Sequence, residues 1–384
     1  MRPGNLVLWE SPRGGPVAAR VAIAGDFLPA GKLEICPTQG WRGMASRLAD
    51  HFCDVAGSFV NLESALDPDG LPARLLCGIG QVVSAPRGAL EYLDAIHSRA
   101  VGIANNHTFD FGPAGVERTR HAISQMKMVP LGAGRTLRDA PEVHVWHGPG
   151  DIRIGFWAAA TATHDRATRR SAGVEPASVA RAAEALEAMK RWGAQFSIAL
   201  LHAGVIRSSR PDRDQVELMD SIARCGFGVV ASSHSHRISG ARIVAGRNGP
   251  PSFCFYGLGS LVSGYAASPL EREGLIVTAG FDSGGNLVRV ELRPVLIGNS
   301  GFGEIPPPEM GRNILARFVE LCGEIAEGSY EHLFYKEVSR GLVRLYLRDM
   351  RAAFREGGVG GLARKVSRAR MRHVERLVRG VIPS

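Results

Sequence analysis

The sequence lacks several features that would assign it to the membrane or to the secreted proteins. It has no run of about 18 apolar residues, so it encodes no transmembrane helix. The segment from Met1 to Arg20 carries charges and prolines but no apolar stretch, so we expect no secretory signal peptide. No two of the six cysteines form a CxxC pair, which argues against a zinc knot or a disulfide framework. We therefore predict a cytoplasmic protein with buried free thiols at Cys53, Cys77, Cys225 and Cys254.

The composition is that of a globular chain with a basic C-terminal end. Of its 384 residues, 45% are hydrophobic and 22% are charged, which is enough for one large domain with an appendage. The formal net charge is +9, and it is concentrated between Arg344 and Arg379, where eleven Lys and Arg residues face only three acidic ones. The basic character therefore belongs to the tail and not to the main domain.

Short apolar segments alternate with amphipathic ones over the first 300 residues, and no internal repeat is evident. The apolar segments predict buried strands at Val21–Gly25, Gly57–Asn61, Ala100–Ala104, Ile152–Ala159, Phe196–Leu201, Gly228–Ala231 and Phe253–Tyr256. The amphipathic segments predict helices at Gly88–Ser98, Pro113–Lys127, Pro176–Trp192 and Asp214–Arg224, two of them starting at a proline. This alternation predicts a layered α/β domain.

A segment rich in glycine and proline, Gly301–Pro308, is interpreted as a linker. We therefore divide the chain into an N-terminal extension (1–19), a main domain (20–300) and a basic helical region (309–384). Within the last region, helices are predicted at Met310–Glu327, Tyr330–Arg355 and Gly361–Arg379.

Polar residues of the kind that bind metals follow the ends of five predicted strands. In an open α/β sheet, the loops at the carboxyl ends of the strands build the binding site. A common site is therefore expected for residues that lie far apart in the sequence. These residues are Asp26, Glu63, Asn106 with His107, His202, and His234 with His236.

Each of these signals has a simpler interpretation when it is taken alone. Asp26 could cap a helix, and Glu63 could be a solvated loop acid. Asn105, Asn106 and His107 could form a turn. His202 could be a hydrogen-bonded structural histidine.

The pair His234 and His236 could lie on the surface. If they continued a strand, however, side chains two residues apart would point to the same face and could bind one ion.

Taken together, the set of carboxylates, one amide and three imidazoles suits one or two divalent metal ions. Mixed oxygen and nitrogen ligands fit Mn, Fe, Zn or Mg and do not distinguish among them. Such residues can hold two ions about 3.5–4 Å apart, which lower the pKa of a bridging water and bind a phosphoryl or acyl oxygen.

The order of these motifs resembles the bacterial CapA family of capsule and poly-γ-glutamate synthesis proteins, which is related to the calcineurin-like metallophosphoesterases. The resemblance covers about residues 20 to 265 and rests on a series of short motifs. These are Gly25-Asp26, Asn61-Leu62-Glu63, Asn105-Asn106-His107 with Asp110 and Gly112, His202-Ala203-Gly204, Ser232 to His236, and Tyr256 to Ser260.

The resemblance implies a fold, a ligand set and a catalytic residue. The fold would be a layered metallophosphoesterase-like α/β sandwich with helices on its outer faces. The metal ligands would be Asp26, Glu63, Asn106, His202, His234 and His236. His107 would be the catalytic acid beside the metal, acting on the leaving group or on a developing oxyanion.

Seven positions depart from the patterns of the family and of the related metallophosphoesterases, among them Ser232, Ser233, Ser235 and Ser260, which replace Gly, His, Pro and Asn. Leu28 replaces the histidine that many metallophosphoesterases carry in the first motif, and Ile206 replaces a glutamate. Ala203 replaces a tryptophan, which predicts a more open pocket.

Two functions follow as alternatives. The first is a metal-dependent hydrolase of a phosphoester or related bond, acting on a small molecule or a polymer in capsule or poly-γ-glutamate biosynthesis. The second is a non-catalytic accessory subunit of a capsule or polymer synthesis complex that keeps the fold.

The arginine-rich tail is expected to form a solvated helical face. Binding to an anionic surface, such as the membrane periphery, is the alternative. Only Tyr346 and Phe354 interrupt the basic residues, so no specific nucleic-acid binding is predicted.

Overall fold

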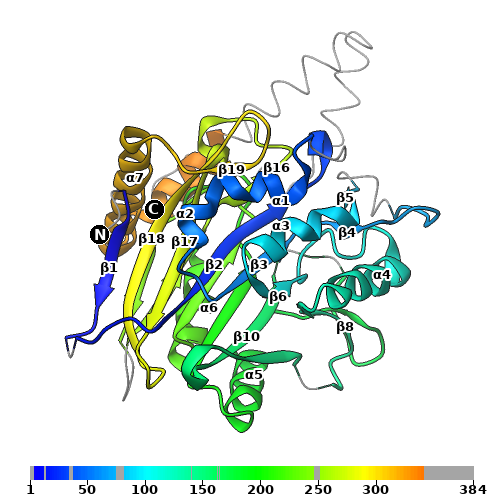
Figure 1. The fold of residues 1–384 in the computed structure, drawn as a ribbon, viewed down its shortest axis with the longest axis horizontal. Coiled ribbons are helices and arrows are strands. Elements are labelled where there is room, and N and C mark those ends of the chain that lie inside the picture. Colours follow the sequence, from blue (N-terminus) through cyan, green and yellow to red (C-terminus); the bar gives the residue numbers. More distant parts are fainter. Residues whose placement is uncertain are drawn as a thin grey trace.

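Two β-sheets packed face to face form the centre of the protein, and helices cover their outer sides (Figure 1). The computed structural model describes residues 4–12, 14–33, 38–74, 82–139, 141–161, 163, 165–245 and 251–340. The predicted α/β layering is confirmed.

The larger sheet has nine strands in the order β1-β18-β17-β2-β3-β6-β7, with β16 beside β2 and β19 beside β18. Its strands are β1 (Leu6–Glu10), β2 (Ala19–Leu28), β3 (Gly57–Leu62), β6 (Ser98–Gly102), β7 (Val129–Leu131), β16 (Ser260–Ser263), β17 (Glu273–Phe281), β18 (Leu287–Ile297) and β19 (Gly303–Glu304). The strands β2, β3, β6 and β7 run parallel, so their carboxyl ends lie at one edge of the sheet.

The smaller sheet has six strands in the order β14-β15-β13-β12-β10-β9. They are β9 (Val143–His147), β10 (Arg153–Ala160), β12 (Phe196–His202), β13 (Val229–Ser233), β14 (Ala241–Val244) and β15 (Ser252–Phe255). The four central strands are parallel. Two further pairs of short strands lie outside these sheets: β4 (Ala65–Leu66) with β5 (Ser84–Ala85), and β8 (Ala133–Arg135) with β11 (Gly173–Val174).

The core is divided between the two faces of the smaller sheet. Along β12, Ile198 and Leu200 pack between the sheets, whereas Ala199 and Leu201 pack in a second cluster beneath the outer helices. A strand buried on both faces needs a continuous apolar sequence, which explains why this one was predictable. Aromatic contacts such as that of Phe59 with Phe156 connect the two sheets.

The helices that lie wholly within the described residues are α1 (Gly40–Ala45), α2 (Ala49–Phe52), α3 (Leu90–Ala95), α4 (Gly112–Gln125), α5 (Val179–Arg191), α6 (Arg213–Cys225) and α7 (Pro308–Glu327). The predicted start of α5 at Pro176 is wrong. Pro176 and Ala177 pair with Ala160 at the end of β10, and Ser178 then caps the helix by accepting a hydrogen bond from the backbone N–H of Arg181. Asp212 caps α6 in the same way.

The seven predicted strands all form. In addition, segments predicted to lie outside the main domain pair with its larger sheet at both ends. The strand β1, inside the predicted N-terminal extension, pairs with β18. Gly303 and Glu304, inside the predicted linker, also pair with β18 as β19.

The helix α7 packs Ile314 and Phe318 into the main core and lies beside β14 and β18. Residues 330–340 are helical as predicted. The basic tail beyond them lies outside the described residues.

The cysteine prediction holds in part. Cys254 is buried, Cys225 and Cys322 are half-buried, and no described cysteine is in a disulfide. The prediction was wrong for Cys53, which is exposed because it lies at the C-terminal end of α2. Cys36 and Cys77 lie outside the described residues.

Among the described helices, none has the length and apolar character needed to cross a membrane.

Candidate metal centre

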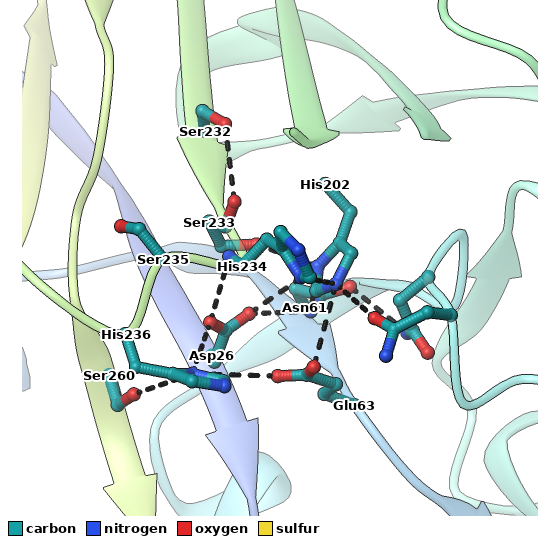
Figure 2. A network of polar contacts seen from close by, with 12 residues as sticks. Asp26, Asn61, Glu63, His202, Ser232, Ser233, His234, Ser235, His236 and Ser260 are labelled. Carbon is teal, nitrogen blue, oxygen red and sulfur yellow. Dashed lines mark hydrogen bonds and ion pairs between the residues drawn. The ribbon is translucent and has the colours of Figure 1, made fainter. Parts of the chain in front are cut away.

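The two sheets bring their carboxyl ends together, and the predicted site residues lie at this junction. Asp26 belongs to β2 and Glu63 follows β3, both in the larger sheet. His202 ends β12, and His234 follows β13 in the smaller sheet. Figure 2 shows these four side chains pointing toward one another, together with His236.

A close backbone approach explains the glycine before Asp26. A Cβ atom at Gly25 would lie 2.0 Å from the backbone oxygen of Gly259, which is far inside contact distance. The same carbonyl accepts a hydrogen bond from the backbone N–H of Asp26 at 3.1 Å. At this point β2 changes its partner from β17 to β16. Gly25 therefore allows the approach that holds Asp26 in place.

Asp26 is fully buried, and both of its carboxylate oxygens are engaged. Asn61 Nδ2 donates to Oδ1 at 2.8 Å, and the backbone N–H of His234 donates to Oδ2 at 3.0 Å. His236 Nδ1 lies 3.1 Å from Oδ2. Burial opposes ionisation, but the hydrogen bond and the charge of His236 outweigh it and hold the pKa of Asp26 well below its usual range.

Glu63, from the larger sheet, lies between the imidazoles of His202 and His236, which come from the smaller sheet, and is also buried. Its Oε1 is 3.5 Å from His202 Nε2, and its Oε2 is 3.7 Å from His236 Nδ1. Oε2 has no hydrogen-bond partner among the described residues. A buried carboxylate oxygen without a partner is costly, and a cation would satisfy it.

His202 connects Asn106 to the histidine pair. Its Nε2 lies 2.7 Å from Asn106 Oδ1 and 2.9 Å from His234 Nδ1. Three ligand-type atoms thus lie close to one another. Burial, reinforced by the neighbouring charges of His202 and His236, holds the pKa of His234 well below its usual range, so this imidazole is neutral and able to act as a ligand.

His234 and His236 converge by a route that the sequence did not predict. Both residues follow β13 in a turn and not within a strand. Their φ angles are 97° and 55°, in the left-handed region that histidines seldom occupy. The two imidazoles share a site because this turn directs them inward, and the strand alternation invoked for them was wrong.

The imidazole of His107 is held by a contact with Asp110. Its Nδ1 lies 2.8 Å from Asp110 Oδ2, which also accepts a hydrogen bond from the backbone N–H of Val83. Burial lowers the pKa of His107, but the hydrogen bond to Asp110 and the charge of Glu63 outweigh it, so the pKa is raised. The imidazole therefore favours its protonated form.

Two overlapping groups of side chains have the composition and spacing of metal sites. Glu63, His202 and His234 form one group, and Asp26, Glu63 and His236 form the other, each with its ligand atoms within 4.8 Å of one another. Glu63 belongs to both. The donor set, together with the unpartnered Oε2, fits divalent cations. Asn106 adds an amide oxygen beside His202.

The structure therefore brings together all seven residues that the sequence singled out. It also shows three supporting residues that sequence reasoning did not name as functional: Asn61, Asn105 and Asp110. Asn105 Nδ2 donates to the backbone oxygen of Leu62 at 2.8 Å and so connects the loop after β6 to β3. All three lie inside the sequence motifs described above, and their place in those motifs is the signal that could have identified them.

Some departures from the family pattern contact the proposed ligands: Ser233 Oγ lies 3.3 Å from His202 Nδ1, and Ser260 Oγ lies 3.5 Å from His236 Nδ1. Leu28 packs with Ala30 and Val83 in a small apolar cluster. Ala203 is buried beneath α5 and α6, so the expectation that it opens the pocket was wrong.

Comparison with solved structures gives distant similarities. A 5'-nucleotidase precursor from Thermus thermophilus is 14% identical, with a TM-score of 0.45, over 79% of this chain and 58% of that chain. The NAD nucleotidase of Haemophilus influenzae is 13% identical, with a TM-score of 0.43, over 78% and 61%. The calcineurin-like phosphoesterase YfkN from Bacillus subtilis is 12% identical, with a TM-score of 0.43, over 81% and 99%.

This chain thus spans about three fifths of the length of the first two structures. No curated protein matches it. The model of the bacterial capsule synthesis proteins, PGA_cap, matches residues 20–265, a segment that contains every proposed ligand. The chain belongs to this bacterial capsule synthesis protein family.

Proposed function

We propose that this protein is a metal-dependent hydrolase of a phosphoester or related bond that acts in bacterial capsule or poly-γ-glutamate biosynthesis. The observation that carries the proposal is the buried Glu63 carboxylate, which belongs to two groups of ligand-type side chains and keeps one oxygen without a hydrogen bond. A chain that kept only the fold would have no reason to maintain this costly arrangement.

The ligand set would be Asp26, Glu63, Asn106, His202, His234 and His236. When bound there, divalent ions would supply Lewis-acid polarisation of a phosphoryl or acyl oxygen and activation of water. The protein's own residues hold these side chains in place. Asn61 fixes Asp26, and Asn105 connects the loop that carries Asn106 to β3.

His107 is proposed as the catalytic acid. With Asp110 accepting from its Nδ1, the proton on Nε2 is free to be donated to the oxygen of a leaving group. The raised pKa of His107 favours the form that carries this proton. The side chain of His107 is 19% exposed, so a substrate can reach it.

The test combines metal analysis with turnover of a panel of phosphoester and γ-glutamyl substrates. The wild type should bind one or two divalent ions and hydrolyse at least one substrate. His107→Ala should keep the metal and lose about 10²–10⁴-fold in turnover, as expected for loss of a general acid. The matched control is His121→Ala, which changes an exposed histidine on α4 and should leave turnover unchanged.

Two outcomes would contradict the proposal. If the purified protein held no divalent ion and gained nothing when one was added, the metal site would be refuted. If it held metal but turned over no member of the panel, the accessory-subunit alternative would be favoured.

A further inference from the structure

A glutamate outside the family match contacts both segments that leave the site in the smaller sheet. Glu337 lies in the helical residues 330–340, beyond the matched residues 20–265. Arg237 Nη1 donates to its Oε1 at 2.9 Å. Ser208 Oγ donates to Oε2 at 3.3 Å, and the backbone N–H of Ser209 donates to Oε1 at 3.2 Å. With Arg210 Nη1, which donates to Oε2 at 3.4 Å, one carboxylate thus holds four partners from two segments.

Each of these segments begins at a proposed ligand. The first follows His202 and includes Ser208 and Ser209. The second is the turn of His234 and His236, which Arg237 follows directly. The two segments also contact each other, because the backbone N–H of Arg207 donates to the backbone oxygen of Ser235 at 2.8 Å.

The histidine turn needs such support. Its two histidines have positive φ angles, and a residue in a sparsely populated backbone region stays there only when its surroundings fix it. The contacts of Glu337 are hydrogen bonds to a charged group, which are stronger than those between neutral groups. Arg237 and Glu337 are only 15% and 20% exposed, so solvent screens their attraction less than it would on the surface.

A second glutamate provides a matched comparison. Glu324 on α7 binds Arg210 through both carboxylate oxygens, with Nε to Oε2 at 2.7 Å. Arg210 also contacts Glu337, at 3.4 Å. The two glutamates therefore belong to one network, but only Glu337 contacts Arg237 and so the histidine turn.

We propose that Glu337 is a positioning residue for the metal centre. It fixes the turn of His234 and His236 through Arg237, and the segment after His202 through Ser208 and Ser209. Its role in metal binding rests on the proposed function, whereas its hold on the two segments does not. The helical region after the matched family segment is then part of the site's framework.

The first readout is amide hydrogen exchange of the full chain. In Glu337→Gln, peptides covering residues 203–212 and 233–240 should exchange about tenfold faster, as expected when hydrogen bonds to a charged group are lost. Peptides from α5 should be unchanged. Glu324→Gln should accelerate exchange around residue 210 and leave the histidine turn protected. Unchanged exchange in residues 233–240 of Glu337→Gln would overturn the proposal, whether or not metal binds.

The second readout is the affinity for Mn²⁺ or Zn²⁺, measured well below the unfolding temperature of each variant. Glu337→Gln should bind about tenfold more weakly, within the range known for residues that support metal ligands. Glu324→Gln should match the wild type. An equal loss in both variants would indicate a general effect of stability and would refute a specific role. Faster exchange in Glu337→Gln, combined with a wild type that binds no metal, would refute the proposed function and leave the positioning role standing.

Discussion

The substitution Gly25→Ala tests how the backbone positions the first proposed ligand. The new methyl group would lie 2.0 Å from the carbonyl oxygen of Gly259 and 3.2 Å from the Cβ of Leu258. The φ angle of Gly25 is not in the left-handed region, so the cost would come from the clash and not from backbone strain. Because the clashing atom belongs to the backbone, rotation of a side chain cannot relieve it.

The size of the effect follows from two contributions. Overpacking of a buried site costs about 1–3 kcal/mol. Displacement of Gly259 would also break the hydrogen bond from the N–H of Asp26 to its carbonyl, which costs about 1 kcal/mol. We therefore expect the free energy of unfolding to fall by about 2–4 kcal/mol. Metal affinity should fall as well, because Asp26 moves with its backbone.

The assay is urea unfolding monitored by circular dichroism, with Gly323→Ala as the control. Gly323 lies inside α7, and an added methyl group there would meet no atom within 4 Å. This control should gain about 0.5–1 kcal/mol, because alanine is the better helix former. If Gly25→Ala were as stable as the wild type and bound metal equally well, the reasoning from close backbone approach would be refuted.

Three further predictions concern the site itself. Glu63→Gln should weaken metal binding by about 100-fold or more, since it removes a charge shared by both ligand groups, and the metal-free protein should lose stability at neutral pH because the buried charge of His236 loses one of its carboxylate partners; unchanged affinity in a metal titration would count against Glu63 as a ligand. In protein stripped of metal, burial disfavours the charged form of His236. The nearby carboxylates of Glu63 and Asp26 outweigh this effect and raise the pKa of His236 to about 9. Metal binding should therefore release roughly one proton near pH 7, and affinity should rise with pH until about 9, which calorimetry in buffers of different ionisation enthalpy measures; binding without proton release would argue against His236. Asp110→Asn should reduce turnover by about 100-fold, because it removes the negative charge that favours the protonated form of His107, with metal affinity unchanged; equal turnover would remove Asp110 from the mechanism.

The sequence was sufficient where a segment is buried on both faces. The strand β12 reads as a continuous apolar run because Ile198 and Ala199 face two different apolar layers. The strand β18 was missed because it contains Glu291, Arg293 and Pro294, which suggest a loop. Its charges are buried through ion pairs with other segments, such as that of Arg293 with Asp54 at 2.8 Å. Those pairings depend on the fold and cannot be inferred from local composition.

The candidate site was also predictable from the sequence only in part. Strand ends that carry Asp26 and His202 predicted convergence, because the carboxyl ends of parallel strands share an edge. That these two residues come from different sheets was not predictable, since short apolar runs do not specify which strands pair. The positive φ angles of His234 and His236 were equally hidden, because they depend on neighbours such as Arg207 and Glu337.

Because Glu63 belongs to both ligand groups, binding of one metal ion should change the affinity for a second. A first cation beside Oε1 would withdraw electron density from the carboxylate and place a positive charge close to the second position, so the two binding constants cannot be independent. The second ion should bind more weakly than the first. The fraction of doubly loaded protein would then follow the concentration of free metal over a wide range.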